Sequence, residues 1–149
     1  MDASQACIDI VAYFEGFSAN KYNDAAGHCT IGYGTLLHRG NCDGTEGYAE
    51  GISEPDAKAL LASSLCRVAQ EVTEIVKLPL KQCQFDALCA FAYNLGCHAL
   101  VESTLLLAIN SGTFADVPDQ FRRWDFAAGV ELAGLKRRRV AEAAMWSSG

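Results

Sequence analysis

The sequence has no apolar run near the roughly 20 residues that a membrane-spanning helix needs. Its first five residues do not combine a basic region with an apolar stretch, so we expect no secretory signal. Positive charge is scarce, because 12 lysines and arginines stand against 18 aspartates and glutamates. The net charge of −6 argues against nucleic acid as the partner. Internal repeats and low-complexity tracts are missing as well, so we expect no repeat architecture.

Metal-binding motifs are also missing. The seven cysteines form no Cys-x-x-Cys pair, and the three histidines lack zinc-finger spacing, so we expect no metal and no cofactor. This many cysteines suits an oxidising compartment and up to three disulfides. The alternative is that the thiols are buried as small apolar residues. Sequence does not give the connectivity, and Cys29–Cys42 and Cys89–Cys97 are working guesses.

What is present suits one folded domain. Of the 149 residues, 50% are hydrophobic and 20% are charged, so the chain can form a core. Apolar residues recur at helical spacing in several segments, often after a capping residue or a proline. These patterns predict helices over 3–15, 54–76, 81–95, 103–110, 117–124 and 135–146, and a loop over 127–134. In the last helix we expect Val140, Ala143 and Ala144 to face inward.

The stretch 14–35 holds the most informative chemistry. Gly16 ends the first predicted helix just after Glu15, and 22–33 is predicted to be a hairpin around a Gly-containing turn. Glu15 would then face Asp24 and Thr30 on a small sheet. The negative end of a helix favours a protonated Glu15, and a protonated acid opposite an ionised carboxylate is what cleavage of a glycosidic bond requires. Taken singly, these residues are also ordinary at helix ends and turns.

The spacing of the three residues resembles that of the phage-type lysozymes, the endolysins of glycoside hydrolase family 24. Eight residues separate Glu15 from Asp24, five separate Asp24 from Thr30, and Thr-Ile-Gly-Tyr-Gly starts at Thr30. Later segments, among them 81–97 and 134–142, resemble the family too. One departure is Thr35, because many relatives carry histidine after the Gly-x-Gly sequence; here the histidine is His38.

The resemblance implies an α+β, lysozyme-like fold, in which a small antiparallel sheet lobe is joined by a long helix to a helical lobe. Residues 1–149 would form one domain. The small lobe would take about 16–55, the helical lobe about 1–15 and 77–149, and the connecting helix about 54–76.

The resemblance also implies which residues bind the glycan in a cleft between the lobes: Leu36, Tyr93, Asn94 and Thr104. Thr104 could equally cap its helix together with Ser103. A cation is expected near Glu15, and the sequence does not choose between Lys136 and Arg137. Trp124 is expected in the core rather than in a sugar site.

By the same resemblance, the domain would hydrolyse the β-1,4 bond between N-acetylmuramic acid and N-acetylglucosamine in peptidoglycan. Glu15 would donate the proton, Asp24 would orient a water or stabilise the oxocarbenium charge, and Thr30 would hold that water, with inversion at the anomeric carbon. A lytic transglycosylase, which uses one glutamate and no second carboxylate, is one alternative. A non-catalytic wall-binding or effector module is another.

The expected partner is the glycan strand of peptidoglycan, with the protein acting as a monomer in the periplasm or cell wall. Without a visible signal peptide, phage or secretion machinery would deliver it. A phage endolysin, a tail-associated lysozyme and a secreted antibacterial effector all fit these features. Only the effector would have an immunity protein as a further partner.

Overall fold

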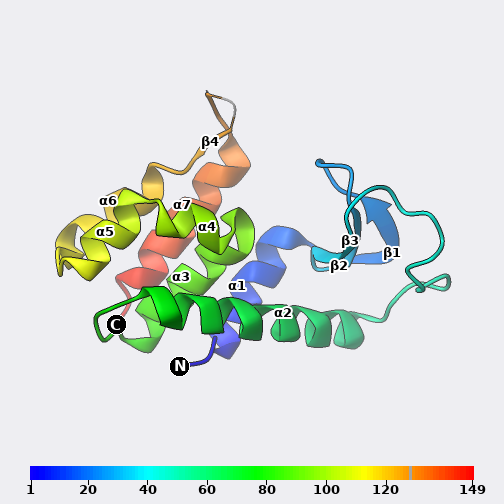
Figure 1. The fold of residues 1–149 in the computed structure, drawn as a ribbon, viewed down its shortest axis with the longest axis horizontal. Helices are drawn as coiled ribbons and strands as arrows, with labels where there is room; N and C mark the ends of the chain where they lie inside the picture. The colour runs from blue at the N-terminus through cyan, green and yellow to red at the C-terminus, as the bar shows by residue number, and fades with distance from the viewer. Residues whose placement is uncertain (128) are drawn as a thin grey trace. The chain divides into compact units, whose positions relative to one another are not determined.

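The computed structural model describes residues 1–127 and 129–149. A helix, a three-stranded sheet and a long helix come first, and shorter helices and a two-stranded hairpin follow (Figure 1). None of the described helices combines the length and apolar character that crossing a bilayer requires. The elements are α1 Gln5–Glu15, β1 Ser18–Asn23, β2 Cys29–Gly32, β3 Thr35–His38, α2 Glu54–Ile75, α3 Gln82–Leu95, α4 Cys97–Val101, α5 Thr104–Asn110, η1 Phe114–Asp116, α6 Val117–Arg122, β4 Phe126–Ala127, β5 Val130–Glu131 and α7 Ala133–Trp146.

The chain divides into two compact units. The sheet unit comprises residues 8–65, and the helical unit comprises residues 1–7 and 66–149. Both boundaries fall inside helices, so α1 and α2 each contribute residues to both units. The predicted α+β class, with a small antiparallel sheet and a long helix, is confirmed.

In the sheet unit, β2 is the central strand and pairs antiparallel with β1 and β3. All four residues of β2 are buried, and Ile31 packs in a core with Val11 and Leu61 as further buried members. Gly32 adopts a φ of +66°, and a Cβ there would lie 2.9 Å from the Cβ of Ala57 in α2. A side chain at this position would therefore push the sheet away from the helix.

In the helical unit, α3, α6 and α7 pack against one another (Figure 1). An aromatic cluster fills the space between them. Phe91 meets Phe121 edge-on at 5.8 Å and Trp124 at 5.5 Å between ring centroids, and Phe121 lies 6.2 Å from Trp146. Each such pair stabilises the fold by about 0.5–1.5 kcal/mol beyond the contribution of burying its apolar area. Trp124 therefore packs against the core, as predicted.

The predicted loop over 127–134 is wrong for most of its length. β4 and β5 pair antiparallel there, and α7 already begins at Ala133; residue 128 lies outside the described residues. Strands of two residues are too short for an alternating pattern to be visible in the sequence. The short helix α4 was also not predicted; it starts directly after Gly96, which has a φ of +87°.

The face that α7 buries differs from the prediction. Val140 and Ala144 are exposed, and only Ala143 of the three predicted residues is buried. The buried stripe instead includes Arg139, Glu142 and Trp146. The cause is an ion pair between Arg139 and Glu142, whose charges make these two positions look like solvent-facing ones in the sequence.

The cysteines form one disulfide in the described part of the chain, between Cys29 and Cys42, which confirms the first of the two guesses. The second guess is wrong, because Cys89 and Cys97 are free, and the expected maximum of three disulfides is not reached. Cys7 and Cys89 are fully buried thiols. They pack as small apolar residues, and burial raises the pKa of Cys7 to about 12.

Candidate active site

Glu15 is the last residue of α1 and is half-buried. Gly16 ends the helix with a φ of +70°, and its N–H donates to the Ala12 carbonyl at 3.0 Å. The turn between β2 and β3 comes close to the Glu15 carboxylate: a Cβ on Gly34 would lie 2.6 Å from Oε2. Gly34, with a φ of +75°, is thus the residue that lets the sheet approach this acid.

Asp24 lies in the turn between β1 and β2. Its Oδ1 accepts hydrogen bonds from the backbone N–H groups of Ala26 and His28, both at 2.9 Å. The bond from His28 is the largest of the effects that hold the pKa of Asp24 below its ordinary value, and the Thr30 hydroxyl adds to it. Asp24 is therefore ionised at neutral pH.

Thr30 occupies the middle of the sheet. It pairs with Tyr22 on β1 and with Leu36 on β3, and residues that face each other in this way point to the same side of a sheet. Thr30 is only 3% exposed, whereas Tyr22 and Leu36 are 37% and 51% exposed. Its hydroxyl donates to the His28 carbonyl at 3.0 Å.

Tyr22 is influenced by both carboxylates. Burial raises the pKa of Tyr22, and the negative charges of Glu15 and Asp24 raise it further. Both acids therefore act electrostatically on its phenol group. Glu15, Asp24 and Thr30 all belong to the sheet unit, and the charges of both carboxylates act on Tyr22.

The loop after β3 is fastened beside this group. The disulfide joins Cys42 of the loop to Cys29, the neighbour of Thr30. Two hydrogen bonds add to it: the Gly40 N–H donates to His28 Nδ1 at 2.9 Å, and the Cys42 N–H donates to Asn23 Oδ1 at 2.8 Å. The loop is therefore tied to both strands that flank Asp24.

Glu46 is the second anchor of the loop. Its carboxylate, only 2% exposed, accepts from Lys21 Nζ and from His38 Nε2, each at 2.9 Å. His38 Nδ1 also donates to the Arg39 carbonyl at 2.9 Å, so both ring nitrogens act as donors, which favours the charged imidazole and raises the pKa of His38. His38, Asp43 and Glu46 place ligand atoms within 4.8 Å of one another. Because Lys21 and charged His38 already neutralise the carboxylates, this cluster is an ion-pair network rather than a metal site.

The remaining predicted residues lie in the helical unit. Tyr93 and Asn94 are half-buried at the end of α3, and Asn94 Oδ1 accepts from Arg139 Nη2 at 2.9 Å. Thr104 is exposed and donates to Gln120 Oε1. Ser103 caps α5 by accepting from the Leu106 N–H at 3.0 Å, so the capping role belongs to Ser103. Lys136 and Arg137 are exposed on α7.

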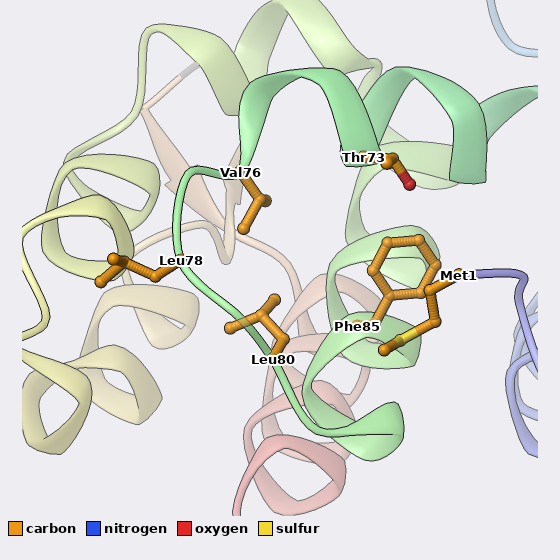
Figure 2. A pocket seen from close by; sticks show the side chains of 6 residues that line it. All are labelled: Met1, Thr73, Val76, Leu78, Leu80 and Phe85. Carbon is orange, nitrogen blue, oxygen red and sulfur yellow. The ribbon is translucent and has the colours of Figure 1, made fainter.

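The helical unit also contains an apolar hollow of about 130 Å³. Figure 2 shows the side chains that line it, which come from the chain start, the end of α2, the segment between α2 and α3, and the start of α3. They are Met1, Thr73, Val76, Leu78, Leu80 and Phe85. No predicted site residue is among them, and their composition is that of a gap at the edge of a core.

A glutamate at a helix end, with a second carboxylate and a hydroxyl on a hairpin of this α+β fold, fits a lysozyme-type glycoside hydrolase, which uses a pair of carboxyl groups. The family model "Phage lysozyme" matches residues 12–142. The chain therefore belongs to the phage lysozyme family.

Individual proteins agree with this membership. The endolysin of Bacillus phage B103 is 35% identical across the whole chain, which spans 55% of that protein's length. The endolysin of Acyrthosiphon pisum secondary endosymbiont phage 1 is 31% identical, with 99% of both chains covered. Among solved structures, the muramidase domain of SpmX from Asticaccaulis excentricus matches with a TM-score of 0.86 at 28% identity, covering 99% of both chains.

Proposed function

We propose that this domain hydrolyses peptidoglycan at the β-1,4 bond between N-acetylmuramic acid and N-acetylglucosamine. The observation that carries the proposal is a pair of carboxyl groups in the sheet unit. Asp24 is held ionised by two backbone N–H groups, and the turn between β2 and β3 approaches the carboxylate of Glu15 at Gly34. The endolysin and muramidase names of the similar proteins support the same substrate.

In the proposed mechanism, Glu15 gives its proton to the glycosidic oxygen as the bond breaks. Positive charge develops on the sugar ring, and the carboxylate of Asp24 stabilises it or orients the attacking water. Thr30, whose hydroxyl lies beside Asp24, holds that water. Direct attack by water inverts the anomeric carbon.

The glycan-binding part of the proposal uses Leu36 in the sheet unit and Tyr93, Asn94 and Thr104 in the helical unit. Leu36 offers an exposed apolar surface opposite Thr30. Asn94 and Thr104 offer polar groups, and exposed Lys136 or Arg137 offers positive charge. The protein acts on the cell wall as a monomer, and phage or secretion machinery delivers it. An immunity protein is a partner only if the chain is an effector.

The test is turbidity loss of purified peptidoglycan with wild type, Glu15→Gln and Asp24→Asn. Both substitutions keep the shape of the side chain, so we expect melting temperatures close to that of wild type. The rates of peptidoglycan lysis should fall by roughly 10²–10⁴-fold. Lysis by Glu15→Gln at the wild-type rate would show that Glu15 is not the general acid.

Product analysis separates hydrolysis from the transglycosylase alternative. Hydrolysis leaves a reducing sugar end, and NMR of the first anomer formed reports inversion or retention. A 1,6-anhydro-muramic end would contradict the proposed reaction.

A further inference from the structure

An ion pair that the proposed mechanism does not use lies at the centre of the helical unit. Arg139 is fully buried, and Glu142 is 3% exposed. Arg139 Nη2 donates to Glu142 Oε1 at 2.8 Å and to Asn94 Oδ1 at 2.9 Å. The guanidinium carbon lies 5.0 Å from the ring centroid of Phe91.

Stability alone does not account for this pair. Arg139 Nε and Nη1 and Glu142 Oε2 are buried and find no hydrogen-bond partner among the described residues. Burial also raises the pKa of Glu142 to about 7, even beside Arg139. Buried ion pairs of this kind can usually be replaced by apolar residues of similar volume without loss of stability. The pair is therefore expected to have another role.

That role is visible in the contact with Asn94. A guanidinium only donates hydrogen bonds, so the atom of the Asn94 amide that faces Arg139 must be the oxygen. Both protons of Nη2 are used, one on Asn94 and one on Glu142. The NH₂ group of Asn94 then points away from Arg139, and this side chain is half-exposed at the end of α3.

We infer that Arg139, held by Glu142, is a positioning residue that fixes the Asn94 amide as a hydrogen-bond donor toward an acceptor oxygen of the glycan. The acceptor is an acetamido carbonyl or a hydroxyl of an N-acetylated sugar. The inference rests on the proposed function, because it gives Asn94 a substrate. It adds two buried residues, Arg139 and Glu142, that do not touch the sugar.

The test replaces the pair by apolar residues, as Arg139→Met with Glu142→Leu. We expect the melting temperature to stay equal or rise. KM for peptidoglycan should rise about five- to tenfold with kcat within twofold, because a bound-state hydrogen bond becomes mispositioned. Asn94→Ala should have the same effect, and combining it with the pair variant should add nothing further.

A matched control is available on α6, where Arg122 pairs with Asp119 at the same 2.8 Å distance, three residues apart, in solvent. Arg122→Met with Asp119→Leu should leave KM unchanged. The inference is overturned if the folded Arg139/Glu142 variant keeps the wild-type KM. The inference is also overturned if the increase in KM caused by the pair variant and the increase caused by Asn94→Ala multiply in full when the two are combined.

A second measurement does not need the pair variant to fold. In Glu15→Gln protein, the side-chain NH₂ signals of Asn94, identified by their loss in Asn94→Asp, should shift when soluble peptidoglycan fragments are added. No shift at saturation would overturn the inference. Fragment binding by Glu15→Gln also separates the inference from the proposed function. If Glu15→Gln binds the fragments but wild type does not cleave them, the proposed function is contradicted and the role of Arg139 still stands.

Discussion

Because Gly34 has no side chain, the carboxylate of Glu15, the proposed catalytic acid, has room beside it. A Cβ at this position would lie 2.6 Å from Glu15 Oε2, so Gly34→Ala must displace the carboxylate. We expect kcat on peptidoglycan to fall at least about tenfold, because a misplacement of about 1 Å can lower a rate by 10². The positive φ should lower the free energy of unfolding by about 1 kcal/mol. Turbidity kinetics and thermal unfolding measure the two effects.

Gly44→Ala is the control for Gly34→Ala. Gly44 has a φ of +89° and nothing within 4 Å of its would-be Cβ. This variant should show a similar loss of stability with unchanged kcat. Equal loss of activity in both variants would mean that backbone strain, rather than contact with Glu15, is responsible.

Single residues were predictable from the sequence where their chemistry is local. The spacing of Glu15, Asp24 and Thr30 identified three residues that all lie in the sheet unit, and their catalytic roles stay predictions. The role of Gly34 was not predictable, because it depends on a contact between the β2–β3 turn and the end of α1. Whether Leu36 and Thr104 bind sugar stays a prediction.

At the scale of elements, the disulfide closes the loop beside β2. Cys29 and Cys42 are 13 residues apart, and a disulfide that closes a loop of this size raises the free energy of unfolding by about 3 kcal/mol. Cys29→Ala with Cys42→Ala should lower the melting temperature by roughly 6–12 °C. Dithiothreitol should lower that of wild type but not that of the variant. Trypsin should cut the variant after Arg39.

Cys66→Ala serves as the control, because Cys66 is exposed and free. Its melting temperature and tryptic pattern should match those of wild type. A variant without the disulfide that resists trypsin as well as wild type would show that the Glu46 anchor holds the loop alone.

The Glu46 anchor depends on pH. The Arg39 carbonyl and then Glu46 raise the pKa of His38 above its ordinary 6.5, so its contribution is complete below pH 6.5 and is lost as pH rises through the folded-state pKa. Lys21 and then His38 lower the pKa of Glu46 below its ordinary 4.5, so its contribution is complete above pH 4.5 and is lost in acid. The contributions of His38 and Glu46 to stability are therefore both present in full between pH 4.5 and 6.5.

His38→Gln should therefore lower the melting temperature most between pH 4.5 and 6.5, and less at pH 8–9. Thermal unfolding of both proteins across this range measures the difference. His98→Gln is the control, since the His98 side chain is 86% exposed in its pair with Glu102, and its loss should change the melting temperature little. A pH-independent difference for His38→Gln would contradict the ion-pair assignment.

Elements with strong periodicity or clear ends were predicted well, and α1, α2 and α3 lie close to their expected bounds. The buried face of α7 was not. Charged residues mark a solvent face in sequence patterns, and only the fold reveals that Arg139 and Glu142 neutralise each other inside the helical unit. The β4–β5 hairpin is held by tertiary context, because strands this short have little intrinsic signal.

At the scale of the whole molecule, charge is unevenly distributed between the units. Residues 8–65 contain eight acidic and three basic side chains, a net of −5, whereas the helical unit has ten acidic and nine basic ones. The sheet unit, which holds Glu15 and Asp24, would therefore approach a wall rich in peptide carboxylates against electrostatic repulsion. Overall composition indicated the sign of the charge but not this asymmetry, which depends on where the units divide.

Salt should consequently raise activity on peptidoglycan. The screening length falls from about 30 Å at 0.01 M to about 10 Å at 0.1 M salt, so we expect kcat/KM to rise two- to fivefold over this range. A neutral N-acetylglucosamine oligomer should show no such rise. Reversing one exposed charge, as Glu50→Lys, should raise the low-salt rate and flatten the curve. A rate that falls steadily with salt from 0.01 M would instead mean that exposed Lys136 and Arg137 dominate the encounter with the wall.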